Sequence, residues 1–124
     1  MAQEKREINP QSVIRGVLSF LRADTITSSF RILHGAFLKL RNSGNFPLLQ
    51  NVLFHNDQSR QLDEEFSSLY RTGVIRFANY SGTKYLLERE VLISIRRRLP
   101  ERFTAEEIVQ LSIIAERLEE MIAT

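Results

Sequence analysis

Residues 67–90 read SSLYRTGVIRFANYSGTKYLLERE, and this stretch decides the fold that the sequence predicts. An amphipathic helix ends at residues 71–73, because Gly73 can adopt the left-handed conformation that closes helices. Two short runs rich in β-branched and aromatic residues follow, on either side of SGT. They predict a β-hairpin with Gly82 at the position of positive φ. A helix followed by a hairpin is typical of a winged helix-turn-helix, in which the hairpin is the wing.

Two helices are predicted in the first part of the chain. Asn9 and Pro10 have the order of an N-cap and a first helical residue, where proline loses no needed N–H. A second helix begins after Asp24 or Thr25, either of which can cap it, and ends at Gly44. Their apolar faces are Val13, Ile14, Val17, Leu18 and Leu21 in the first helix, and Ile26, Phe30, Leu33, Phe37 and Leu40 in the second.

Shorter elements connect these helices to the hairpin and continue beyond it. Pro47 opens a short, mostly buried helix, and residues 55–59 form a polar turn. The next helix runs from about residue 59 to residue 71, and a further short helix ends before Pro100. The core face of the helix of residues 59–71 is Leu62, Phe66 and Leu69.

The last helix, residues 104–122, has the clearest signals. Thr104 and Glu107 have the spacing of a capping box. Apolar residues then recur at the spacing of a coiled coil, in a stripe broader than one small domain needs. We therefore expect a homodimer through this helix, with packing across the first helix of the same chain as the alternative. The predicted dimerisation residues are Ile108, Leu111, Ile114, Leu118, Met121 and Ile122.

The composition predicts one soluble domain. The chain has 124 residues, of which 43% are hydrophobic and 26% charged. We expect a polar arm over residues 1–8 and a mainly α winged-helix domain over residues 9–124. No apolar run is long enough to cross a bilayer and no secretion signal is recognisable, so we expect a cytoplasmic protein. The absence of cysteine excludes disulfides and thiolate metal sites.

The residues that could carry chemistry predict no enzyme. His34 and His55 have no partner at metal-ligand spacing, and a packed histidine is the expected role of His34. The acids Asp63, Glu64 and Glu65 are consecutive on a helix, so they point in three directions and predict a solvated face. We expect no metal and no cofactor.

Duplex DNA is the expected partner, with another protein as the alternative. Arginine and serine on the outer face of the helix of residues 59–71 can contact guanine edges and phosphate, and polar residues of the hairpin suit phosphate or minor-groove contacts. Glu64 on the same helix would weaken such binding. The run of residues 96–98 is either a phosphate clamp or a solvated face. The candidate DNA-binding residues are Arg60, Ser67, Ser68, Arg71, Arg76, Asn79, Tyr80 and Lys84.

Residues 26–90 also resemble a family of small bacterial winged-helix proteins. The shared pattern is an aromatic residue, a serine, a leucine-rich helix, the sequence GVI and a strand. The resemblance is to Panacea-type antitoxin domains and their defence-associated relatives. Where that family has a glycine-proline-aromatic turn before the serine, this chain has HNDQ. The resemblance implies a winged-helix fold and a part in bacterial regulation, and it assigns no functional residue. The residues that carry it are Phe54, Ser59, Leu62, Phe66, Leu69, Gly73, Ile75 and Tyr85.

Overall fold

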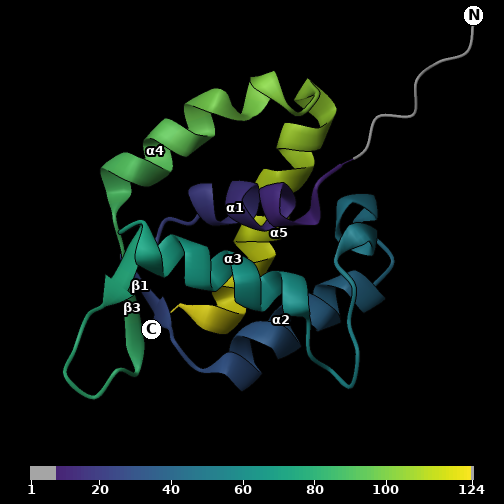
Figure 1. Cartoon of the computed structure of the whole chain (residues 1–124). Helices are drawn as coiled ribbons and strands as arrows, with labels where there is room; N and C mark the ends of the chain where they lie inside the picture. The colour runs from purple at the N-terminus through teal and green to yellow at the C-terminus, as the bar shows by residue number, and fades with distance from the viewer. Residues whose placement is uncertain (1–7, 124) are drawn as a thin grey trace, which may run out of the picture.

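Helix α1 (Pro10–Ser19) occupies the centre of the computed structural model, which describes residues 8–123 (Figure 1). The Oδ1 atom of Asn9 accepts a hydrogen bond from the N–H of Gln11, and Pro10 is the first helical residue, as predicted. α1 packs against α3, α4 and α5, which is why most of its side chains are buried. Ile8 also packs on the core, so the polar arm predicted for residues 1–8 does not include it. Residues 1–7 lie outside the described part of the chain.

A three-stranded antiparallel sheet stands at one end of the helices. It is made of β1 (Thr25–Thr27), β2 (Ile75–Phe77) and β3 (Lys84–Leu87), in the order β1-β3-β2. The predicted hairpin is confirmed: β2 pairs with β3, and Gly82 between them has φ of +69°. Strand β1 was not predicted. Its three residues pair with β3 and with nothing nearby in sequence, so no local signal marks it.

The start of α2 (Phe30–Asn42) corrects the prediction. Its N-cap is Ser29, whose Oγ accepts from the N–H of Ile32, and neither Asp24 nor Thr25 caps it. Ile26, expected on the stripe of this helix, is instead fully buried in β1 and pairs with Tyr85. Phe30 begins the helix and is 43% exposed, so it is not a core residue. The shift of the cap by four or five residues follows from the extended backbone that pairing with β3 imposes.

The elements between α2 and β2 agree with those predicted from the sequence. The 3₁₀-helix η1 (Pro47–Asn51) is followed by a turn in which Asn56 and Asp57 have positive φ. Helix α3 (Arg60–Arg71) is capped by Ser59 and buries Leu62, Phe66 and Leu69. Gly73 closes α3 with φ of +78°.

The C-terminal elements are α4 (Arg89–Arg98), the 3₁₀-helix η2 (Leu99–Glu101) and α5 (Ala105–Ile122). Thr104 and Glu107 form both hydrogen bonds of the predicted capping box. α5 packs against α1, α2 and β1. In Figure 1 it passes behind α1 and α3. No helix within residues 8–123 is long and apolar enough to cross a membrane.

This packing of α5 corrects the predicted dimerisation residues. Those residues supply the monomer core, because α1 and α2 cover the stripe that we expected to face a second chain. A side chain with no accessible surface cannot add contact area to a dimer of folded subunits. Leu111, Ile114 and Leu118 are 0% exposed and Ile122 is 1% exposed, while Ile108 and Met121 are half-buried against the core.

Candidate interaction site

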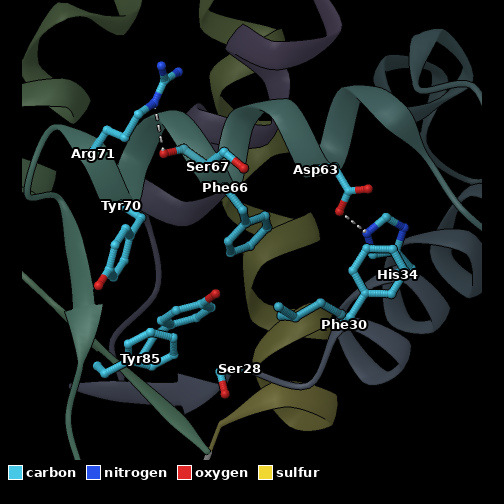
Figure 2. A pocket seen from close by; sticks show the side chains of 11 residues that line it. Ser28, Phe30, His34, Asp63, Phe66, Ser67, Tyr70, Arg71 and Tyr85 are labelled. Carbon is cyan, nitrogen blue, oxygen red and sulfur yellow. Dashed lines mark hydrogen bonds and ion pairs between the residues drawn. The ribbon is translucent and has the colours of Figure 1, made fainter. Parts of the chain in front are cut away.

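A pocket of about 490 Å³ lies between α2, α3 and the sheet (Figure 2). We call it the aromatic pocket, because five rings from four elements line it. Leu33 and polar groups from the β1–α2 connection, α2 and α3 complete the lining. The rings are Phe30, Phe66, Tyr70, Phe77 and Tyr85, and the polar residues are Ser28, His34, Asp63, Ser67 and Arg71.

The sheet register and the spacing of α3 bring the rings together. Phe77 and Tyr85 are directly opposite each other on β2 and β3, so their side chains share one face of the sheet and stack at 5.2 Å between centroids. Phe66 and Tyr70 are one turn apart on α3. Phe66 lies 6.2 Å from the ring of Tyr85, and Tyr70 lies 5.4 Å from that of Phe77. The result is one continuous aromatic wall.

Tyr85 lies deeper in this wall than the other tyrosine, Tyr70. Burial of its side chain, and to a smaller extent the neighbouring Tyr70 hydroxyl, raises the pKa of Tyr85 above its ordinary value of 10.0. Burial disfavours the phenolate because a charged group loses its hydration in an apolar site. The phenol of Tyr85 is therefore held in its neutral form.

His34 and Asp63 form a polar pair at the opposite end of the pocket. The Nε2 atom of His34 lies 3.1 Å from Oδ1 of Asp63, and its Nδ1 accepts a hydrogen bond from the N–H of Ser59 at 2.9 Å. Because Nδ1 uses its lone pair as an acceptor, the ring proton is on Nε2 and the ring is neutral. His34 is 3% exposed and stacks on Phe30 at 3.9 Å. The prediction of a packed histidine is confirmed, although a carboxylate partner was not foreseen.

The three consecutive acids of α3 do point in three directions, but they do not form a solvated face. Asp63 binds His34. Glu64 is exposed and accepts hydrogen bonds from Arg60 and from Gln11 of α1. Glu65 is fully buried and pairs with an arginine of α1. Proximity of α1 to α3 explains this difference from the prediction, because it removes one side of α3 from water.

Three of the four candidate DNA-binding residues of α3, Arg60, Ser67 and Arg71, are exposed on the face opposite its buried side. Arg60 is exposed, and its Nε lies 3.0 Å from Glu64. Ser67 and Arg71 lie beside the aromatic pocket, and Arg71 donates a long hydrogen bond of 3.4 Å to the carbonyl of Ser67. Ser68 is half-buried and lies one turn after Glu64. Ser68 therefore lies at the edge of the outer face.

The candidate residues of the hairpin are exposed. Arg76 on β2 pairs with Glu88 at 2.8 Å. In the turn, Asn79 hydrogen-bonds with Thr83, and Tyr80 is fully exposed. Lys84 begins β3 and is exposed. Two of the four predicted cationic contacts, Arg60 and Arg76, thus have carboxylate partners within the chain.

The arginine run of α4, residues 96–98, was predicted to be a phosphate clamp or a solvated face. One of its members instead has a structural role within the chain. Both Nε and Nη2 of Arg96 donate to the carbonyl of Ser19, at 3.1 and 2.8 Å, and its guanidinium lies 5.2 Å from the ring centroid of Phe20. Arg98 pairs with Glu101. Arg97 is exposed. Arg96 therefore stabilises the C-terminal end of α1, where helix carbonyls lack intrahelical partners.

Sequence reasoning missed the aromatic pocket as a site. Tyr70, Phe77 and Tyr85 recur at intervals of seven and eight residues, but only the sheet register aligns their side chains. Phe30 was predicted to be buried because α2 was expected to begin earlier. It is exposed because α2 begins at Phe30 itself. Within residues 8–123, no group of three or more histidine, aspartate or glutamate residues could hold a metal ion together.

The chain has no match among protein-family models, curated proteins or solved structures.

Proposed function

We propose that this chain is a winged helix-turn-helix module without catalytic activity, which binds another protein through the surface between α3 and the β2–β3 hairpin. The support for the fold is the order α1, β1, α2, α3, β2, β3 together with the strand order β1-β3-β2. In this proposal α3 is the recognition helix and the hairpin is the wing. The connection between α2 and α3 contains η1 and is longer than the turn of most helix-turn-helix motifs.

The observation that carries protein binding is the exposed aromatic surface around the pocket. Phe30, Tyr70 and Phe77 are 43%, 48% and 46% exposed, and all three line the same pocket. Contiguous exposed apolar residues mark interaction sites, and aromatic residues are enriched in protein interfaces. A pocket of about 490 Å³ can receive an anchor side chain of a partner.

The geometry of His34 supports a role without catalysis. A general base needs a free nitrogen within reach of the group that it deprotonates. The backbone of Ser59 occupies Nδ1 of His34, and Asp63 occupies Nε2. The proposed setting is bacterial regulation or defence, as in the Panacea-type proteins that residues 26–90 resemble.

Duplex DNA is the second candidate partner. Lys84, Asn79 and Tyr80 favour it, because they are exposed on the hairpin where phosphate contacts would form. Against it, Arg60 and Arg76 would have to exchange their carboxylate partners for phosphate. Asp63 and Glu64 would also lie near the DNA and repel it. Protein binding therefore ranks first.

Peptide selection tests the proposed partner class. Random peptides displayed on phage are selected on the immobilised protein and then measured against two double variants. Tyr70→Ser/Phe77→Ser removes two rings of the pocket, and Val109→Ser/Ile113→Ser removes two exposed apolar residues of α5 as the matched control. We expect the selected peptides to lose binding to the first variant and to retain it with the second. Peptides that bind both variants alike would refute the proposal.

A salt titration tests DNA in parallel. Fluorescence anisotropy of a labelled random duplex is measured at about 20 mM and about 150 mM salt, because phosphate contacts release counterions and weaken steeply with salt. We expect no salt-dependent binding. Binding at low salt that is lost in Arg71→Ala/Lys84→Ala would instead favour the DNA candidate.

A homodimer through α5 requires a different surface from the one expected. Val109 and Ile113 are 57% and 41% exposed and are one turn apart on α5. We propose that any dimer uses these two residues. Light scattering should then give a mass that falls to that of a monomer in Ile113→Glu. A dimer that survives this change would exclude the surface.

A further inference from the structure

We infer that the aromatic pocket receives a cationic side chain of the partner protein, an arginine or a lysine, with Asp63 as its counter-ion. This inference rests on the proposed function, because it names the chemistry of the partner that the α3–hairpin surface binds. It depends on the His34–Asp63 pair, on the rings of the pocket and on the charges around them.

The carboxylate of Asp63 is held in place by a neutral partner. The N–H of Ser59 fixes the tautomer of His34, which then donates its remaining proton to Oδ1 of Asp63. Because the ring is neutral, this hydrogen bond orients the carboxylate without neutralising it. The Asp63 side chain is 47% exposed and lies at one end of the pocket (Figure 2). Buried His34 thus holds Asp63 in position. Binding residues are commonly held in this way by hydrogen bonds from residues behind them.

The rings add to the attraction of a cation. The face of an aromatic ring is electronegative, and ammonium and guanidinium groups bind over it. The apolar stem of lysine or arginine can pack along the same rings while its charged end reaches a carboxylate. In the aromatic pocket, Phe66 lies between the Tyr70–Tyr85 end and the Asp63 end (Figure 2). A long cationic side chain can therefore contact rings and carboxylate together.

No cation of the described chain takes this position. Within residues 8–123, the side chain of Asp63 is hydrogen-bonded to the neutral ring of His34 and is paired with no lysine or arginine. Arg71 also lines the pocket, but its guanidinium is directed away from Tyr85 and Asp63 (Figure 2), and its Nε donates to the Ser67 carbonyl. The charge of Asp63 is thus left for an incoming group. An anionic group, such as a phosphate or an acidic side chain, would be repelled by it.

A protein fits this site better than a free amine. Phe30, Tyr70 and Phe77 remain about half exposed around the pocket. A small amine would fill the pocket and leave these rings in water. A polypeptide that inserts one side chain would cover them as well, and this burial would add to its affinity.

A titration with a matched pair of probes tests the inference. N-acetyl-arginine amide and N-acetyl-citrulline amide have nearly the same shape, but only the first is charged. Binding is followed by NMR through the tyrosine ring protons, because Tyr70 and Tyr85 line the pocket and Tyr80 is fully exposed on the hairpin. We expect the arginine probe to shift Tyr70 and Tyr85 but not Tyr80, and to bind about fivefold or more tightly than the citrulline probe.

Two variants of adjacent acids provide the control. Asp63→Asn keeps an acceptor for His34 and removes the charge, whereas Glu64→Gln removes a charge that lies outside the pocket lining. The preference for arginine should vanish in Asp63→Asn and persist in Glu64→Gln. Equal binding of the two probes to the wild type, a preference that survives Asp63→Asn, or no shift of Tyr70 and Tyr85 would each overturn the inference. If the selected peptides still require Tyr70 and Phe77 in that case, the proposed function stands and only the cationic anchor is wrong.

Discussion

The fully buried carboxylate of Glu65 on α3 accepts two hydrogen bonds from the guanidinium of Arg15 on α1. Nε of Arg15 lies 2.7 Å from Oε2, and Nη2 lies 3.1 Å from Oε1. The Arg15 side chain is 44% exposed, so water reaches only one partner of the pair. This pair fixes α3 on α1, and α3 supplies Asp63, Phe66 and Tyr70 to the aromatic pocket. The Arg15–Glu65 pair thus holds in place the helix that carries these pocket residues.

Replacement of Arg15 should destabilise the fold strongly. Arg15→Ala leaves a buried carboxylate without its partner, which costs about 3 kcal/mol of unfolding free energy. Arg60→Ala is the matched control, because Arg60 pairs with Glu64 at the surface of the same helix and should cost within about 0.5 kcal/mol. Denaturant melts measure both changes. Equal losses would show that Glu65 is solvated when Arg15 is absent.

Replacement of two helical glycines by alanine should change the stability of the fold in opposite directions. A Cβ atom at Gly16 would lie 2.9 Å from Cδ1 of Leu111 and 3.3 Å from Cδ2 of Leu99, both of them core side chains. The gain in helix propensity of about 1 kcal/mol is then offset by overpacking of about 1–3 kcal/mol. A Cβ at Gly35 meets nothing within 4 Å, so Gly35→Ala should gain stability. Thermal melts that rank Gly16→Ala as the more stable variant would contradict this packing of α1 on α5.

Local signals explain the parts of the fold that the sequence predicted. The β2–β3 hairpin depends on Gly82 and its flanking runs, and the start of α5 on Thr104 and Glu107, which are three residues apart. α3 follows from its cap at Ser59 and the spacing of its apolar residues. Each of these elements is specified within one or two turns of chain, where periodicity and capping rules apply.

Long-range contacts explain the parts that could not be predicted. β1 exists because residues far along the chain, in β3, supply its hydrogen bonds. The partner of Asp63 is His34, 29 residues away on another helix. The apolar stripe of α5 has the same pattern whether α1 and α2 or a second chain covers it. Such pairings depend on tertiary packing, about which helical periodicity carries no information.

High pH should weaken the fold through Tyr85. Burial raises the pKa of Tyr85 in the folded state above its ordinary value of 10.0, so the folded protein holds this proton more tightly than the unfolded chain does. The resulting stability is fully present below about pH 10 and is lost as the pH rises through the pKa of the folded state.

Comparison with Tyr85→Phe isolates this effect from the titration of lysines. Phenylalanine cannot ionise, so the variant should lose less stability than the wild type above pH 10. The measurement is the free energy of unfolding in denaturant between about pH 8 and about pH 11. Parallel curves for the two proteins would mean that the Tyr85 phenolate is hydrated in the folded state.

Substitutions in α5 should cost much more unfolding free energy at its buried residues than at its exposed ones. Leu118 is 0% exposed and Ile113 is 41% exposed, although both are apolar residues of the same helix. Leu118→Ala removes buried methyl groups and leaves a cavity, so it should cost about 2–5 kcal/mol. Ile113→Ala should change stability by about 0.5 kcal/mol or less, because its side chain remains largely in water. Denaturant melts of both variants measure the difference.

A charged residue at position 118 distinguishes a residue of the monomer core from a residue of a dimer interface. Leu118→Glu places a carboxylate without a partner among the side chains that α5 shares with α1 and α2, and burial of such a charge opposes folding. The variant should therefore unfold, as circular dichroism would show. If Leu118 faced a second chain instead, the variant would stay folded and sediment as a monomer. A folded, monomeric Leu118→Glu would mean that the broad apolar stripe of α5 is an interface and not the core of one subunit.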